Sequence, residues 1–212
     1  MVRLLGGFAT AAMVLAQVAL AQQGTVDRPV LKPGSEWTYN VDASKRNKPG
    51  PAQSPLKRVI KEVGDREITY DLINSTGTRT TVMTTDLNPL SEGMTSGARA
   101  SAPLPFFAFP LEPGKTYGGT LTYPSPFGSV DIQMVVNSKV AEWGEVTVPA
   151  GKFRALRIEM QARSSGGPIN GTRSVKLWYA PEVGQYVRGE FDMTYSPIAG
   201  KTIYELTSYS LK

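Results

Sequence analysis

The chain has 212 residues, with 23 basic and 18 acidic side chains, a formal net charge of +5, and neither cysteine nor histidine. Without histidine there can be no Ser-His or Cys-His nucleophile pair and none of the common His-ligated metal sites. Without cysteine there can be no disulfide and no lipid anchor on a thiol. We therefore expect a protein that is not an enzyme and that uses no cofactor or metal.

The N-terminus has the pattern of a secretory signal peptide. Arg3 supplies the positive charge, residues 4–21 carry no charge, and Ala19-Leu20-Ala21 is the small-x-small pattern after which signal peptidase cuts. Two glycines and two polar residues interrupt the apolar stretch, which disfavours a transmembrane helix; a buried N-terminal helix is the other alternative. We expect residues 1–21 to be removed on export. The mature chain should be soluble, without a transmembrane segment, in the bacterial periplasm or outside the cell.

The mature chain divides into a polar leader, 22–34, and one domain, 35–212. Trp37, Tyr39 and Val41 alternate with polar residues, which is the period of two typical of a half-buried strand. Strand-like segments cover residues 35–43, 57–63, 66–73, 78–87, 115–123, 129–137, 143–148, 152–163, 172–179, 185–195 and 201–211. Short connections favour antiparallel pairing. The sequence therefore predicts an all-β single domain of about ten antiparallel strands, forming a curved sheet, a half-barrel or a sandwich.

Two local patterns add detail. In 152–163 the apolar residues change parity at Ala155, which indicates either a β-bulge or a strand buried on both faces. The pattern L-x-P-G-x-x-aromatic occurs at 31–37 and again at 111–117. An internal duplication into two related halves, about 31–100 and 111–212, is one hypothesis, and chance recurrence of a short turn-plus-strand motif is the other.

Three apparent catalytic motifs do not hold. The Gly-Lys-Thr triplets at 114–116 and 200–202 lack the earlier glycine of a phosphate-binding loop. The S-x-x-K match at 54–57 ends a proline-rich loop instead of lying on a helix. Glu190 and Asp192 project from one strand face opposite an apolar face, as solvent-exposed charges do. A carboxylate-based hydrolase is therefore the least favoured function.

A basic cluster surrounds a proline-rich loop between residues 47 and 55. Its cations are Lys45, Arg46, Lys48, Lys57, Arg58 and Lys61. We interpret it as a solvated loop, with contact to phospholipid or lipopolysaccharide as the alternative. No nucleic-acid partner is expected.

The segment 103–111 is apolar and contains Phe106, Phe107 and Phe109, but it is too rich in proline for an inner strand. A loop packed across one end of the core is one interpretation. The lip or lid of a ligand cleft, or a membrane-touching loop, is the other. Trp178 has the opposite parity to the apolar residues around it, so something should cover it. We expect the three phenylalanines to do so, forming an apolar cleft with Trp178.

Two motifs in the second half are VPAG-x-F at 148–153 and WYAP-x-VG at 178–184. Together they resemble a widespread family of exported bacterial β-proteins of unknown function, and the resemblance extends over most of the mature chain. It implies an envelope location and no established reaction. The motif residues are interpreted as structural, in turns and at strand ends: Pro149, Gly151, Phe153, Tyr179, Pro181 and Gly184.

The function favoured by these patterns is a non-catalytic binding or carrier module for an apolar or lipid-like ligand. The alternative is an envelope interaction or scaffold protein without a ligand cavity. A cavity lined by apolar side chains would separate the two. The expected partners are lipid or another envelope component.

Overall fold

The computed structural model describes residues 24–47, 55–90, 99–125, 130–166, 170–194 and 199–212. The expected signal peptide, 1–21, lies outside the described residues. The described part contains ten strands: β1 (Glu36–Arg46), β2 (Leu56–Val63), β3 (Glu67–Asn74), β4 (Gly77–Thr84), β5 (Thr116–Tyr123), β6 (Ile132–Val148), β7 (Gly151–Ser165), β8 (Gly171–Ala180), β9 (Gln185–Met193) and β10 (Gly200–Ser210). The prediction of an all-β domain is confirmed.

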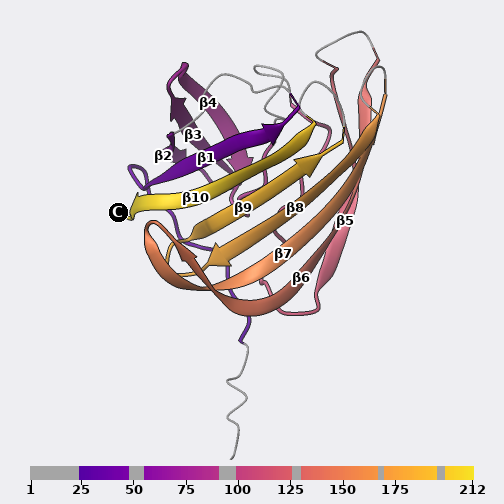
Figure 1. Ribbon diagram of the computed structural model, residues 1–212. Helices are drawn as coiled ribbons and strands as arrows, with labels where there is room; N and C mark the ends of the chain where they lie inside the picture. Colours follow the sequence, from indigo (N-terminus) through magenta and orange to yellow (C-terminus); the bar gives the residue numbers. More distant parts are fainter. Residues whose placement is uncertain (1–23, 48–54, 91–98, 126–129, 167–169, 195–198) are drawn as a thin grey trace, which may run out of the picture.

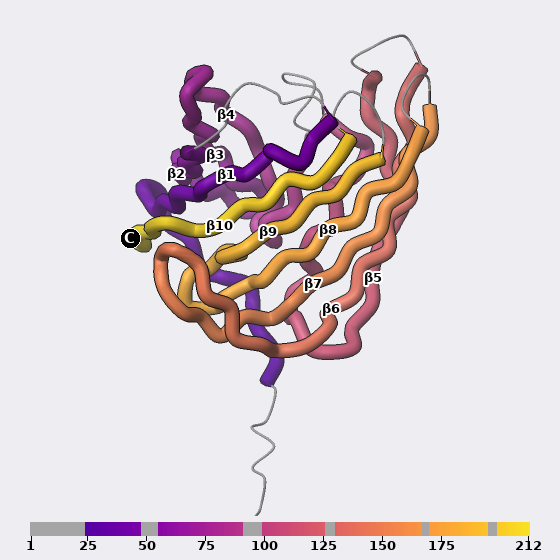
Figure 2. Tube along the Cα trace, viewed as in Figure 1, coloured from indigo at the N-terminus to yellow at the C-terminus, as the bar shows by residue number. Residues whose placement is uncertain are grey.

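All ten strands belong to one antiparallel sheet in the order β4-β3-β2-β1-β10-β9-β8-β7-β6-β5. Neighbours in the sheet are neighbours in the chain, except that β1 pairs with β10 (Figure 2). The sheet is strongly curved (Figure 1) but not closed into a barrel. Its two edges are β4 and β5, and the chain between them has to cross the remaining gap.

The connection from β4 to β5 fills that gap. Leu90 N–H donates to Val82 O on β4 (3.1 Å), and Ser101 N–H donates to Thr122 O on β5 (2.7 Å). At these positions both edges find hydrogen-bond partners without pairing to each other. The same connection carries the apolar segment 103–111.

One face of the sheet holds the core, and we call it the inner face. On β6 the alternation is regular from Ile132 to Val140, with every second side chain buried. The two strands expected at 129–137 and 143–148 are in fact one strand. Its register against β7 shifts between Val140 and Trp143, and this bulge breaks the alternation.

The parity change in β7 has a related cause. The register shift lies in β6, and β7 pairs with β8 without any shift. Ala155 and Leu156 are consecutive and both 0% exposed, so this part of the strand is buried on both faces. Here the β6–β7 hairpin bends toward β10, and Ala150 N–H donates to Leu206 O (2.9 Å). β7 is therefore a strand buried on both faces at this point, and the β-bulge lies in its partner strand β6.

The two L-x-P-G turns have matching geometry. Gly34 and Gly114 have φ values of +84° and +89°, which favour glycine. In both turns the glycine N–H donates to a neighbouring strand, to Ile60 O in one and to Val140 O in the other (2.9 and 2.8 Å). Ile60 and Val140 each return a bond to the residue after the glycine. The hypothesis of a duplication gains local support, and it stays a prediction for the two halves as wholes.

Val26 and Leu31 attach the described part of the leader to the domain. Val26 forms a β-bridge with Leu111, and Val26 and Leu31 are both buried in the core. The core therefore begins before residue 35.

The motif residues lie in two turns and on the strands beside them. Pro149 precedes the turn into β7, where Gly151 has a φ of +137°. Pro181 follows the last residue of β8, and Gly184 (φ +65°) donates to Ala180 O (3.0 Å). Phe153 and Tyr179 are buried core residues.

Candidate functional site

The curvature of the sheet encloses a partly open cavity of about 530 Å³. Strands β2, β3 and β4 form one wall, strands β8, β9 and β10 form the opposite wall, and the β4–β5 connection forms a third. Its apolar lining consists of Leu56, Leu72, Met83, Leu87, Pro89, Leu104, Phe106, Phe107 and Phe191. Three tyrosines and three arginines also line it: Tyr70, Tyr186, Tyr204, Arg58, Arg79 and Arg173.

Arg58 is the central polar side chain of this cavity. Its guanidinium lies between the rings of Tyr70 and Tyr186, with its carbon 5.3 and 5.6 Å from the two ring centroids. Within the described part of the chain its guanidinium makes a long hydrogen bond from Nη2 to the Tyr186 hydroxyl (3.5 Å), and its Nε is buried without a partner there. Among the described residues no carboxylate lies within ion-pair distance of Arg58.

The charge on Arg58 is only partly compensated. Burial opposes that charge, but the phenol oxygens of Tyr186 and Tyr70 raise the pKa of the guanidinium above its ordinary value, so it stays protonated. A cation–π contact is worth about 0.5–2 kcal/mol, whereas removing an ion from water costs several kcal/mol. Two such contacts do not replace an anion, so this part of the cavity remains electropositive.

Two of the lining tyrosines, Tyr70 and Tyr204, are neutral near physiological pH. Burial raises the pKa of Tyr70 above its ordinary value and that of Tyr204 to about 12. Behind the wall, Tyr39 is fully buried and its hydroxyl donates to Tyr186 O (2.8 Å), which fixes the position of Tyr186. The formal charges of the described lining are therefore three arginines and no carboxylate.

The apolar segment forms a fixed wall. Phe106 and Phe107 line the cavity, while Phe109 stacks on Phe107 (centroids 5.7 Å apart) and lies edge-on to Tyr179 (5.5 Å). The buried side chain of Asn88 holds the segment by donating to Phe107 O and accepting from Phe107 N–H, both at 2.8 Å. A fixed wall fits these bonds better than a loose lid.

A second anchor comes from β5 and the turn before it. The Tyr117 hydroxyl donates to Phe106 O (2.7 Å), and Lys115 Nζ donates to Ala108 O (2.6 Å). Both ends of the aromatic run are thus tied to the sheet edge.

Trp178 does not join the three phenylalanines. It alternates with Leu177 and Tyr179, which lie in the core, so it projects from the outer face of β8. There it is half-buried, and Arg188 on β9 covers its ring, with the guanidinium carbon 5.7 Å from the centroid. The predicted parity holds, but a neighbouring arginine and not the phenylalanine segment covers this residue.

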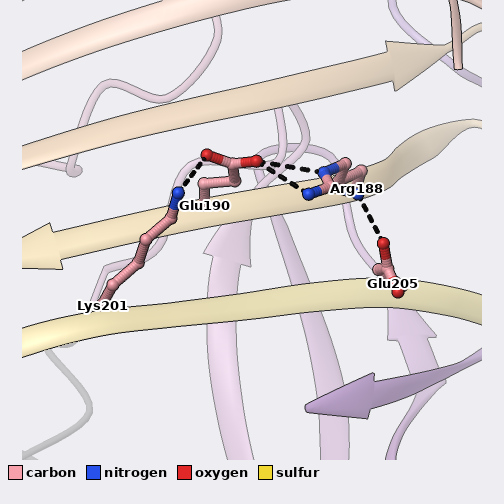
Figure 3. A network of polar contacts seen from close by, with 4 residues as sticks. All are labelled: Arg188, Glu190, Lys201 and Glu205. Atoms are coloured by element: carbon pink, nitrogen blue, oxygen red, sulfur yellow. Dashed lines mark hydrogen bonds and ion pairs between the residues drawn. The ribbon is translucent and has the colours of Figure 1, made fainter. Parts of the chain in front are cut away.

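The outer face also holds Glu190 and Asp192, the two carboxylates that a hydrolase would use. Glu190 accepts from Arg188 and pairs with Lys201, and Arg188 also reaches Glu205 (Figure 3). Burial raises the pKa of Glu190, but the bonds from Lys201 and Arg188 outweigh it and lower the pKa below its ordinary value. Glu190 is thus a paired anion outside the cavity, and Asp192 shares its face by alternation.

The inward position of Arg58 is the functional feature that the sequence analysis missed. Two other cations of the cluster make contacts typical of a solvated surface: Lys57 pairs with Glu36 (2.7 Å) and Lys61 with Asp71 (3.4 Å). Arg46 instead donates from Nε to the hydroxyl of the buried Thr202 (2.7 Å). Arg58 shares its parity with Leu56 and Ile60, which face inward. This shared parity was the signal that could have separated it from the cluster.

The described residues lack two further kinds of site. They contain no group of three or more acidic side chains placed to hold a metal ion. They also contain no helix long and apolar enough to cross a membrane.

The comparisons with known proteins identify the fold. No protein-family model and no curated protein sequence matches the chain. A candidate lipoprotein of Parabacteroides distasonis is similar in structure (TM-score 0.53, 15% identity, covering 89% of this chain and 100% of that one). A candidate exported protein of Bacteroides fragilis with a YmcC-like fold is also similar (TM-score 0.57, 16% identity, 88% and 100%). At these identities the similarity establishes a shared fold, and the family suggested by the two motifs stays a prediction.

Proposed function

We propose that the protein is an exported, non-catalytic binding or carrier protein that holds a lipid-like molecule in its cavity. The observation that carries this proposal is the cavity itself. Its volume of about 530 Å³ lies within the range of roughly 300–1,000 Å³ typical of small-molecule pockets. A run of aliphatic and aromatic side chains lines it, as an apolar chain requires.

The construction of the cavity supports binding over scaffolding. A scaffold needs no interior space, and a curved sheet of this size could have been filled with side chains. Here the inner face carries Gly189 on β9, and a Cβ at this position would come within 3.0 Å of Phe191 and 3.2 Å of Tyr186. Gly189 thus leaves room for two lining rings. The carboxylates Glu190 and Asp192 lie on the other face, which weighs against acid-base catalysis in the cavity.

Export is supported by two separate observations. The N-terminal sequence has the order of charge, apolar stretch and cleavage pattern that defines a signal peptide. Two proteins of the same fold are described as a candidate lipoprotein and a candidate exported protein.

Filling the cavity tests the binding function. Thr81 lines the cavity, and its neighbour Thr80 is exposed and bonded to Asp71 on the outer face (2.7 Å). Thr81→Trp should abolish binding of a neutral hydrophobic fluorescent dye, while Thr80→Trp, the matched control, should leave it unchanged. The unfolding midpoint of each variant shows that it is folded. Equal dye binding by all three proteins, or none by the wild type, would contradict the proposal.

A further inference from the structure

We infer that the ligand is an amphiphile whose anionic head, a carboxylate or a phosphate, binds Arg58 while its apolar chain lies along the phenylalanine wall. This inference rests on the proposed function and specifies the chemistry of the ligand at that same cavity.

The first support is the state of Arg58. It is a protonated guanidinium with no carboxylate within ion-pair distance among the described residues. Its partial exposure is toward the cavity that it lines. A guanidinium offers several donors in one plane, which matches the oxygens of a carboxylate or phosphate. The rings of Tyr70 and Tyr186 hold that plane in place on both sides.

The second support is the distribution of charge and polarity over the lining. Arg79 and Arg173 line the same cavity, and the described lining contains no Asp or Glu. The formal charges of the described lining are therefore all positive, which favours an anion over a cation. The Nε2 of Gln185, another buried lining residue, is a donor without a partner. These unpartnered donors, Arg58 Nε and Gln185 Nε2, suit a ligand that brings acceptors.

The third support is that the cavity holds a cation and an extended aromatic surface together. Arg58 and Tyr70 lie on β2 and β3, and Phe106 and Phe107 lie on the connection between the sheet edges. Phe106 meets Phe191 of β9 edge to face (centroids 6.2 Å apart), which extends the apolar wall across to the opposite strands. One cavity thus offers a cationic part and an aromatic part, as a molecule with a charged head and an apolar chain requires.

The test compares chain-matched probes that differ only in their heads. Dodecanoate, dodecyl phosphate and dodecanol, each below the concentration at which it aggregates, compete with the neutral dye for the full mature protein. The wild type should bind at least one of the two anions about 10-fold to 100-fold more tightly than the alcohol, as a charge-assisted hydrogen bond predicts. The tighter anion then identifies the head as carboxylate or phosphate.

Arg58→Met should remove this preference and leave dodecanol binding unchanged. Arg58→Lys, which keeps the charge, should retain part of it. Lys57→Met is the matched control, because it removes one positive charge from the adjacent residue on the outer face, and it should change nothing.

The outcomes separate the two claims. Equal affinity for all probes in the wild type, or a preference that persists in Arg58→Met, overturns the anionic head but leaves the binding function intact. If the wild type binds neither dye nor probes, the proposed function fails and this inference fails with it.

Discussion

The hydrogen bonds between Asn88 and Phe107 should determine whether the phenylalanine segment is a wall or a lid. In Asn88→Ala both bonds disappear, and the N–H and C=O of Phe107, a residue only 2% exposed, lose their partners. Each unsatisfied buried group costs about 1–3 kcal/mol, so the loss of two partners should lower the free energy of unfolding by about 2–6 kcal/mol. At about 2–4 °C per kcal/mol for a domain of this size, the melting temperature should drop by about 4–24 °C.

The assay is thermal and urea unfolding, followed by the fluorescence of the tryptophans. Asn74→Ala is the matched control, since the Asn74 side chain bonds Thr76 in an exposed turn (2.9 Å to the backbone N–H). It should cost less than about 1 kcal/mol. If the two variants lose the same small amount of stability, Asn88 does not hold the segment, and the segment would have to be regarded as a movable lid.

Three further predictions concern the core, the ion pairs of the outer face and the N-terminus. Trp37 is 0% exposed and its indole N–H donates to Val183 O (2.9 Å), so Trp37→Ala should lower the free energy of unfolding by about 3–5 kcal/mol. Trp178→Ala should lower it by less than about 1.5 kcal/mol in the same urea titration. The reverse order would mean that the faces of the sheet are misassigned. Because the pKa of Glu190 is lowered in the folded state, its contribution to stability is present above the ordinary carboxylate pKa and is lost as pH falls through the folded value. Glu190→Gln should therefore flatten the acid limb of the stability curve below about pH 4.5, and an unchanged limb would contradict the pairing. N-terminal sequencing of the exported protein should begin at Gln22, and an intact Met1 would exclude the signal peptide.

The strands could be predicted because burial on one face leaves a local trace. The alternation of Trp37 and Tyr39 with polar neighbours is enough to locate β1, and most other strands begin and end within two or three residues of the predicted limits. The alternation predicts two strands in place of β6, because a bulge interrupts the period of two while the hydrogen-bonded strand continues.

The site could be predicted only in part, because it depends on contacts between distant segments. The sequence predicts which face of the sheet Trp178 lies on. The side chain that packs on its ring depends on the register of β8 and β9, which places Arg188 opposite it. The phenylalanine segment looked unusual in the sequence, but its role depends on β4 and β5 being the two edges of one sheet. The density of charge around Arg58 predicts a solvated cation, and only its parity with Leu56 and Ile60 indicates that it points inward.

The central claim is that the protein carries a lipid-like molecule in its cavity, and native mass spectrometry of protein purified from its own envelope tests this most directly. The wild type should retain a bound species that is released as an acidic amphiphile. Thr81→Trp, purified in the same way, should lack it, and Thr80→Trp should keep it. A wild-type mass that matches the bare mature chain, or an identical bound species on all three proteins, would contradict the account.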